Sequence, residues 1–379
     1  MVGDIVIIKN LKKLDKPLLL ITILFLIIGL LMVFSASSIV SVLGFGEAPY
    51  YHFLKQLFFV CTGSIIFLTI INIKISSYKK LIYVVLIICF GLLIYVLVNG
   101  AVRNNASSWI NLKFFSFQPS EVTKIALIIF YGIHYGTNFK KMKTNFYIWY
   151  PIIITIIFFV LIFMQPDFGT SFIIASILFG VFFSLPIDKK NKLVMFILIL
   201  SGVTLLVLTI LFCGNRIFSE TQMNRFNFLE PCTRYQEESG YQVCNGYIAI
   251  NNGGLLGQGL GNSTQKYLYL PEMHTDFIFA IIVEELGIIG GVFIILLYLL
   301  LFYRILIISK KANNLTNSII AYGVFIYILV HIIINLGGLL GILPLTGVPL
   351  PFLSYGGTFI WSLIAGISLV QRVAIESRE

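Results

Sequence analysis

The chain has 379 residues, of which 58% are hydrophobic and only 11% are charged. An average soluble domain is about 45–50% apolar and about 25% charged, so a soluble globule of this composition would lack the polar residues to cover its surface. The composition excludes a disordered chain and a disulfide-stapled secreted fold, and it predicts an all-α polytopic membrane protein.

Apolar runs of membrane-spanning length recur along the whole chain. We predict ten transmembrane helices, the fourth and sixth being the shortest, and one large extracellular loop at 214–273, between the seventh and the eighth. The predicted spans lie at 17–36, 53–72, 81–99, 120–137, 148–165, 170–186, 193–213, 274–303, 316–341 and 354–371. We expect 1–379 to form a single membrane domain that contains this loop.

The net charge of +10 comes from basic residues in short clusters between the apolar runs. Placing the N-terminus in the cytoplasm and alternating sides puts 18 of the 26 Lys and Arg residues on the cytoplasmic side. Membrane proteins carry such an excess in their cytoplasmic loops, so the pattern predicts a multi-pass protein with both termini cytoplasmic. A nucleic acid binder gathers its basic residues on a soluble face, and we expect no nucleic acid partner.

Polar residues mark several connections between the spans. Two of the five cysteines, Cys232 and Cys244, lie in the large loop, where an oxidising exterior would let them pair; two free thiols are the alternative. In the fourth span, Glu121 and Lys124 are three residues apart and share a helix face. Charges inside a span are costly and by default indicate function, although an ion pair that neutralises both explains them equally well. Asp167 follows a proline between two spans, where a helix cap is the favoured reading over a functional one.

The large loop contains two candidate phosphate ligands. Arg225 lies among aromatic residues and suits phosphate recognition, with a solvated surface arginine as the alternative. The glycine string 253–261 is not a nucleotide loop, because no βαβ unit fits between two membrane spans. We expect these glycines to let the backbone approach lipid headgroups or a pyrophosphate, with Lys266 supplying the positive charge.

Asp276 is the sharpest candidate for chemistry, because it begins the long run 274–303. A carboxylate at a partly desolvated site can act as a general base or hold a divalent cation; capping of the following helix is the alternative. His274 is expected to pack at the membrane interface rather than to act in catalysis. The adjacent acids Glu284 and Glu285 cannot face lipid, so they must face a cavity or a partner.

The segment 344–358, here called the proline-rich segment, contains three prolines and several glycines, which exclude a regular helix. Irregular backbone at membrane depth is tolerated where protein or a wet cavity covers it. We expect a re-entrant or outer-face loop that lines a site, with an ordinary connector as the alternative.

Eight of these segments, taken in order, resemble the SEDS family (shape, elongation, division and sporulation), which includes FtsW, RodA and SpoVE. They are QPSEVTK (118–124), QPDFGT (165–170), RFNFLEP (225–231), GYQ (240–242), the glycines at 253–261, LPEMHTDF (270–277), EELG (284–287) and the proline-rich stretch 344–357. The run 260–266 looks closer to FtsW or SpoVE than to RodA. Where many members read N-G-A-x-R-W-I, this chain has Asn105 and Ser108 in place of the glycine and the basic residue, and Arg103 lies nearby.

The resemblance implies a glycosyltransferase that polymerises lipid II into peptidoglycan strands at the outer face of the bacterial cytoplasmic membrane, with release of undecaprenyl pyrophosphate and inversion. It implies septal synthesis in cell division, a class B penicillin-binding protein as partner beside other division or elongation proteins, a divalent cation (Mg²⁺ or Mn²⁺) and no organic cofactor. Asp276 would be the catalytic residue and a metal ligand. The residues expected to bind substrate are Gln118, Glu121, Lys124, Asp167, Arg225, Lys266, His274 and Ser354.

Two other functions are compatible with the sequence. A lipid II flippase would also need intramembrane charges, but no inverted repeat is evident and the motifs gather at the outer face rather than at the midplane. A non-catalytic division scaffold would need small-residue helix faces but no buried acids.

Overall fold

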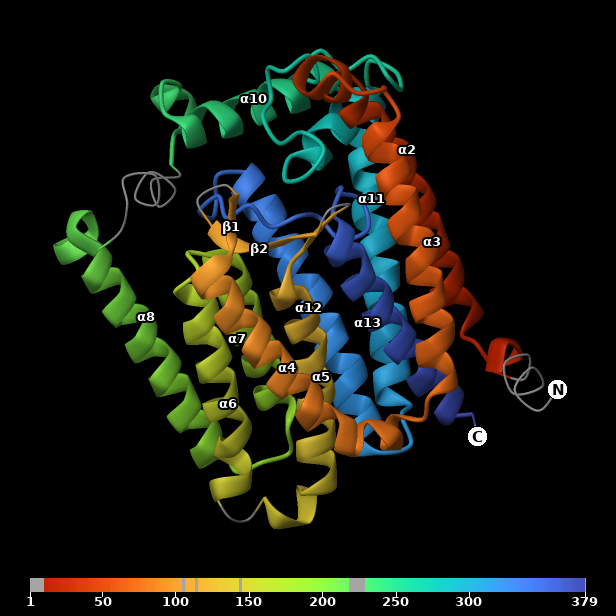
Figure 1. Cartoon of the computed structure of the whole chain (residues 1–379), viewed down its shortest axis with the longest axis vertical. Helices are drawn as coiled ribbons and strands as arrows, with labels where there is room; N and C mark the ends of the chain where they lie inside the picture. Colours follow the sequence, from red (N-terminus) through yellow and green to blue (C-terminus); the bar gives the residue numbers. More distant parts are fainter. Residues whose placement is uncertain (1–9, 104–105, 113–114, 143–144, 218–228, 379) are drawn as a thin grey trace.

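The computed structural model describes residues 10–103, 106–112, 115–142, 145–217 and 229–378, which form a bundle of long helices (Figure 1). The helices are α2 (Lys16–Phe45), α3 (Tyr51–Asn72), α4 (Tyr78–Asn99), α5 (Pro119–Thr137), α6 (Asn145–Phe163), α7 (Phe168–Ser184), α8 (Lys189–Ile217), α10 (Glu238–Gly253), α11 (Ile278–Lys310), α12 (Leu315–Leu339) and α13 (Gly357–Glu376). The shorter elements are η1 (Ile75–Ser77), η2 (Phe139–Lys141), η3 (Pro231–Arg234), β1 (Ala101–Arg103), β2 (Ala106–Leu112) and β3 (Phe115–Phe117).

Each of the ten predicted runs coincides with a helix, and the expected helical membrane fold is confirmed. Within the described residues, eight helices are long and apolar enough to cross a membrane. The other two, α5 and α7, correspond to the runs predicted to be the shortest. The first helix, α2, continues to Phe45 instead of ending at 36. Ser37 and Ser41 lie in this extension and donate their hydroxyl protons to carbonyls one turn back, so their hydrogen-bonding needs are met inside the helix.

A small sheet lies between α4 and α5, where the sequence analysis predicted only a connection. Its strands are antiparallel in the order β1-β2-β3, and Ile110 pairs with Phe117. Phe115 packs its ring 5.4 Å from Trp361 of α13. The sheet therefore leads the chain directly into α5 and covers the beginning of α13.

Helices α5, α12 and α13 form the centre of the bundle, and α8 lies at its edge (Figure 1). Almost every residue of α5 from Ser120 to Tyr135 is buried, which is expected of a helix enclosed on all sides. Only 6% of the spanning part of α8 is buried. The central helices therefore position the interior polar groups, while α8 is left open to the membrane.

Helix α11 is broken at Gly287, whose φ of 73° and ψ of 178° are not helical. The glycine string lies across this break: the amides of Gln258 and Gly259 donate to the carbonyls of Glu284 and Glu285 at 2.9 and 3.0 Å. Gly253 and Gly257 thus lie against the backbone of α11, a contact that the sequence analysis did not predict for the glycine string. Packing decides this, because the broken helix leaves backbone groups that need partners.

The two chain ends meet at one end of the bundle. Asp15 forms a salt bridge with Arg304 of α11 at 2.6 Å, and Arg378 lies 3.3 Å from the same oxygen. Burial raises the pKa of Asp15, but the hydrogen bond and charge of Arg304 outweigh it and hold the pKa below the usual value. The opposite end carries α10 and the large loop (Figure 1), and we call it the loop end.

The large loop is more structured than predicted. It is bounded by α8, which ends at Ile217, and by α11, which begins at Ile278, and it contains η3 and α10. Cys232 and Cys244 form a disulfide with their Cα atoms 5.0 Å apart. The disulfide fastens η3 to α10.

Candidate functional site

Asp276 lies in a turn just before α11, at the loop end, beside the proline-rich segment. The side-chain amide of Asn335 donates to the backbone carbonyls of Asp276 and Val348, each at 2.8 Å. Gly347 is so close that a Cβ there would lie 3.4 Å from Oδ2 of Asp276. The half-buried carboxylate therefore borders the irregular segment that was expected to line a site.

The alternative role of Asp276 as a helix cap is wrong. Helix α11 begins at Ile278, and its N-cap is Phe277, which makes no side-chain capping bond. Asp276 precedes the helix, and Gly287 interrupts it nine residues after its first residue. The backbone of the turn is held by the side-chain amide of Asn335, which comes from α12.

Ser354 supports this turn rather than facing substrate. Its buried hydroxyl accepts from the amide of Leu350 at 2.8 Å and donates to the carbonyl of Thr275. The donor and one acceptor lone pair of this hydroxyl are thus used inside the protein. The geometry does not support the prediction that Ser354 binds substrate; the residue fixes the backbone next to Asp276.

His274 packs in an aromatic cluster, as its interfacial reading predicted. Its ring centroid lies 5.0 Å from that of His52 and 5.7 Å from that of Tyr355. Its Nδ1 is buried and has no hydrogen-bond partner among the described residues. Burial lowers the pKa of His274, and the carboxylate of Glu272 opposes this shift only in part. A neutral imidazole at pH 7 follows.

Gln118 and Asp167 meet at the loop end. Nε2 of Gln118 donates to Oδ2 of Asp167 at 3.0 Å, while Oδ1 of Asp167 accepts from the amide of Thr170 at 3.1 Å. Asp167 is therefore the N-cap of α7, as the favoured reading predicted. The backbone amide of Gln118 in turn donates to the hydroxyl of Thr358 at 3.4 Å, which joins α5 to α13.

Four helices begin around the proline-rich segment. The contacts of Gln118 bring together the first residues of α5, α7 and α13, and Asp276 directly precedes α11. A Cβ on Gly169, in the first turn of α7, would lie 3.0 Å from Cβ of Thr346, so α7 also begins against the segment. Helix N-termini carry positive partial charge and unpaired N–H groups, so their convergence suits an anionic group such as a phosphate.

Glu121 and Lys124 form a buried ion pair one turn inside the bundle. Nζ of Lys124 lies 2.8 Å from Oε1 of Glu121, and the two side chains are 1% and 4% exposed. The hydroxyl of Ser362 donates to the other oxygen of Glu121 at 2.9 Å, and Nζ of Lys124 lies 3.2 Å from Nε2 of His331. Nδ1 of His331 is 2.8 Å from the carbonyl of Tyr327, so Nε2 is left to accept from the ammonium.

Sequence reasoning missed Asn335, His331 and Ser362 in these networks. Polar side chains inside apolar spans were the available signal, and they were not followed through α12 and α13. The pairing of Glu121 with Lys124, in contrast, matches the ion-pair reading of the sequence.

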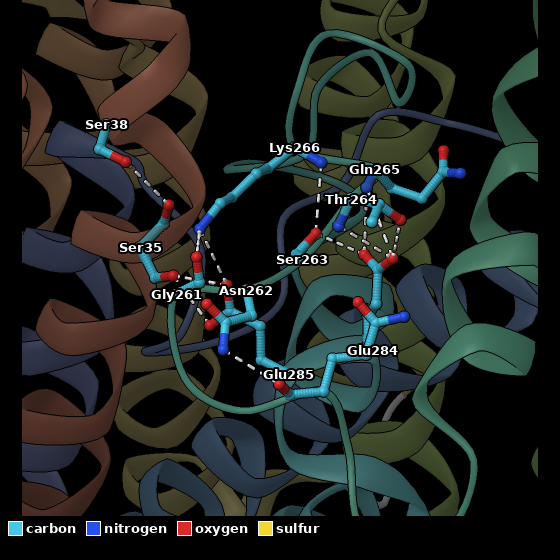
Figure 2. A network of polar contacts seen from close by, with 11 residues as sticks. Ser35, Ser38, Gly261, Asn262, Ser263, Thr264, Gln265, Lys266, Glu284 and Glu285 are labelled. Carbon is cyan, nitrogen blue, oxygen red and sulfur yellow. Dashed lines mark hydrogen bonds and ion pairs between the residues drawn. The ribbon is translucent and has the colours of Figure 1, made fainter.

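A second buried network holds Lys266, Glu284 and Glu285 (Figure 2). Nζ of Lys266 lies 3.4 Å from Oε1 of Glu285 and donates to the carbonyl of Gly261. The hydroxyl of Ser35, on α2, lies 2.6 and 2.8 Å from the two oxygens of Glu285. Both acids are buried against other parts of the protein, not against the cavity or partner that was predicted, and Lys266 also faces inward and is only 4% exposed.

Two predictions remain, that Arg225 binds substrate and that the protein holds a divalent cation. Arg225 lies outside the described residues. Within the described ranges, no three His, Cys, Asp or Glu side chains gather closely enough to hold a metal ion. Asp276 therefore belongs to no such cluster among the described residues.

Known proteins resemble this chain over nearly its whole length. "Probable peptidoglycan glycosyltransferase FtsW" of Bacillus subtilis (strain 168) is 36% identical over 378 residues, covering 97% of this chain and 92% of that protein. "Stage V sporulation protein E" of the same organism is 36% identical over 370 residues, covering 96% and 98%.

Solved structures share the fold. A chain described under "Structural coordination of polymerization and crosslinking by a peptidoglycan synthase complex" matches with a TM-score of 0.74 at 22% identity, covering 97% of this chain and 99% of that one. Rod shape determining protein RodA of Thermus thermophilus matches with a TM-score of 0.69 at 22% identity, covering 97% and 98%. The model of the family that contains FtsW, RodA and SpoVE, described as "Cell cycle protein", matches residues 16–379. The chain therefore belongs to the FtsW/RodA/SpoVE family of cell cycle proteins.

Proposed function

We propose that this protein is a peptidoglycan glycosyltransferase that polymerises lipid II at the outer face of the cytoplasmic membrane, for septal wall synthesis. The observation that carries the proposal is the position of Asp276, whose carboxylate borders an irregular segment around which four helix N-termini converge. A general base beside an anion-binding surface is what transfer from a pyrophosphate donor requires. The names of the relatives support the same activity.

In the proposed reaction, the 4-hydroxyl of the acceptor sugar attacks the anomeric carbon of the donor. Asp276 takes the proton of that hydroxyl, a new C–O bond forms, and the bond to the leaving oxygen breaks. The electron pair of that bond leaves with undecaprenyl pyrophosphate. Direct displacement of an α-linked donor gives a β-1,4 linkage with inversion, so a second carboxylate acting as nucleophile is not required.

The leaving pyrophosphate would be stabilised at the helix N-termini. We propose that α5 and α13, whose first turns have no side-chain cap, direct their positive ends toward it, with Gln118 and Arg225 as further polar contacts. The ion pair of Glu121 and Lys124, which is neutral overall, would lie about one helical turn deeper in the bundle than the reacting groups. Asp167 holds Gln118 in place and caps α7 at the same time.

We propose that a divalent cation, where the reaction uses one, arrives with the substrate. The described residues contain no cluster of three His, Cys, Asp or Glu side chains, and Mg²⁺ is often bound by one or two carboxylates together with substrate phosphates. Asp276 is the carboxylate that could serve as the protein ligand. No step above depends on the ion, and removal of divalent cations from the assay mixture tests this proposal.

Topology and partners follow the same proposal. The end that holds Asp15, Arg304 and Arg378 would lie in the cytoplasm, and the loop end outside. A class B penicillin-binding protein would use the glycan as it is made, which agrees with the coordination of polymerisation and crosslinking described for the solved complex.

The deciding experiment incubates purified protein, with and without a class B penicillin-binding protein, with lipid II and a divalent cation, and measures glycan length on a gel. Wild type should give polymer, and Asp276→Asn should lower the rate by about 10²–10⁴-fold. Glu272→Gln, in the same turn, is the matched control and should remain active. Full activity in Asp276→Asn would refute the base assignment. Absence of polymer from wild type with its partner would favour the flippase or the scaffold, which a lipid translocation assay separates.

A further inference from the structure

Lys266 and Glu285 take no part in the proposed reaction, yet they are buried together beside the break in α11. We propose that they are positioning residues. Their internal charge pair holds the first part of α11, residues 278–286, in place and so determines the position of the Asp276 carboxylate, and Lys266 does not touch the substrate. We call residues 278–286 the α11 head. This inference rests on the proposed function, because Asp276 is the residue that it positions.

The ammonium of Lys266 is occupied within the protein. It donates to the carbonyl of Gly261 and lies 3.4 Å from Glu285, and the two side chains are 5% and 0% exposed. A lysine that receives a leaving pyrophosphate needs an open path to it, whereas this one is enclosed. Glu285 is held in turn by the hydroxyl of Ser35. The pair therefore ties the loop at 261–266 to both α11 and α2.

Glu284 holds the same loop from its other side. Its carboxylate accepts from the hydroxyl of Ser263, from the hydroxyl of Thr264 at 2.7 Å, and from the amide of Thr264 at 3.2 Å (Figure 2). Two consecutive acids of α11 thus engage one short stretch of loop. A shift of that stretch cannot leave the α11 head where it is.

The break at Gly287 makes these contacts decisive. In an unbroken helix the following turns would fix the α11 head through i to i+4 hydrogen bonds. Here the amides of Ile288 and Ile289 donate instead to the carbonyls of Gly254 and Leu255, at 2.9 and 3.3 Å. The loop therefore takes over part of the support that the rest of α11 would give.

The α11 head is a continuous buried piece that leads back to Asp276. Ile278, Ala280, Ile281 and Ile282 have no exposed surface. Because a close-packed interior transmits displacement, a change in the loop contacts reaches the turn that carries the carboxylate.

The substrate-contact and positioning readings of Lys266 predict different kinetics. Glu285→Gln keeps the length of the side chain and its capacity to accept from Ser35, but it leaves the ammonium of Lys266 buried without a counter-charge. Lys266→Met leaves the carboxylate unpaired. The double variant Lys266→Met/Glu285→Gln removes both charges together. A positioning pair is rescued by the double variant, and a pyrophosphate ligand is not.

We would measure kcat and KM for lipid II in polymerisation assays of these three variants. Each single variant should lower kcat on the order of 100-fold with KM unchanged, since misplacement of a reacting group by about 1 Å has that effect. The double variant should recover most of the loss. A raised KM in Lys266→Met, with no recovery in the double variant, would overturn the proposal. Glu376→Gln, which breaks the 3.0 Å pair with Arg372 at the other end of the bundle, is the matched control and should leave kcat unchanged.

Hydrogen exchange gives a readout that does not depend on activity. Both single variants should raise amide exchange in 254–266 and in 276–286, and the double variant should restore protection in both segments. Faster exchange in 254–266 without faster exchange in 276–286 would show that the charge pair does not act on the turn that carries Asp276, and it would overturn the proposal. If wild type makes no polymer, the proposed function fails, and the exchange pattern by itself decides whether the charge pair holds the α11 head.

Discussion

Gly287→Ala should be one of the most damaging single-methyl changes in this protein. A Cβ at this position would overlap the carbonyl oxygen of Leu255 and lie 2.6 Å from the amide nitrogen of Gly257. Both neighbours are backbone, so neither can rotate away. The φ of 73° adds a second penalty, because residues with a Cβ disfavour left-handed backbone.

The size of the effect follows from the hydrogen bonds across the break. Four backbone bonds join the glycine string to α11, two donated by Gln258 and Gly259 and two by Ile288 and Ile289. Each contributes about 1 kcal/mol net. Losing half to all of them, with about 1–2 kcal/mol for the backbone conformation, lowers the free energy of unfolding by about 3–6 kcal/mol.

Thermal unfolding of the detergent-solubilised protein, with hydrogen exchange over 254–266, measures this loss. Gly91→Ala is the control, because nothing lies within 4 Å of its added methyl and alanine favours a helix by about 1 kcal/mol. We expect a lower Tm and faster exchange for Gly287→Ala only. An unchanged Tm and unchanged exchange in that variant would refute the account of the broken helix.

Three further predictions concern groups away from this break. Glu121→Gln leaves the ammonium of Lys124 buried without a counter-charge and should cost about 3–5 kcal/mol of stability; a lower Tm that Glu121→Gln/Lys124→Met partly restores would support this, and an unchanged Tm would contradict it. Cys232→Ser opens a disulfide that closes a loop with a sequence separation of 12, which should cost about 3 kcal/mol and speed protease cleavage of the large loop; unchanged cleavage would count against it. Burial raises the pKa of Asp15, but the hydrogen bond and charge of Arg304 lower it by more than burial raises it. The pKa in the folded state therefore lies below the unfolded value of 3.8. The stability gained is therefore present above 3.8 and lost as pH falls through the folded pKa. Asp15→Asn should weaken the fall of Tm in acid and start from a lower Tm at neutral pH, and an identical acid profile would show that Asp15 does not contribute.

Local chemistry decided the features that the sequence predicted well. The spans follow from the run of apolar residues, and Asp167 caps α7 because an aspartate after a turn can accept from the first helical amides. Glu121 and Lys124 pair because three residues of helix place them on one face. None of these needs information from distant parts of the chain.

Long-range packing decided the features that the sequence left open or predicted wrongly. Lys266 reads as a free loop cation, but in the structure it pairs with Glu285 of α11, which Ser35 of α2 holds in turn. Asp276 reads as the N-cap of the helix that follows it, whereas in the structure the N-cap is Phe277 and Asn335 of α12 holds the Asp276 carbonyl. These contacts join residues far apart in sequence, so no local pattern could predict them.

By itself, the sequence determined the membrane class, the order of the helices and the family motifs, because hydrophobic runs, charge clusters and turn residues act locally. Only the tertiary structure decided that the glycine string pairs with a broken α11, that Lys266 faces inward, and that four helix N-termini converge around the segment beside Asp276. The physical reason is that buried backbone groups and charges must find partners, and which partners they find depends on how the helices pack.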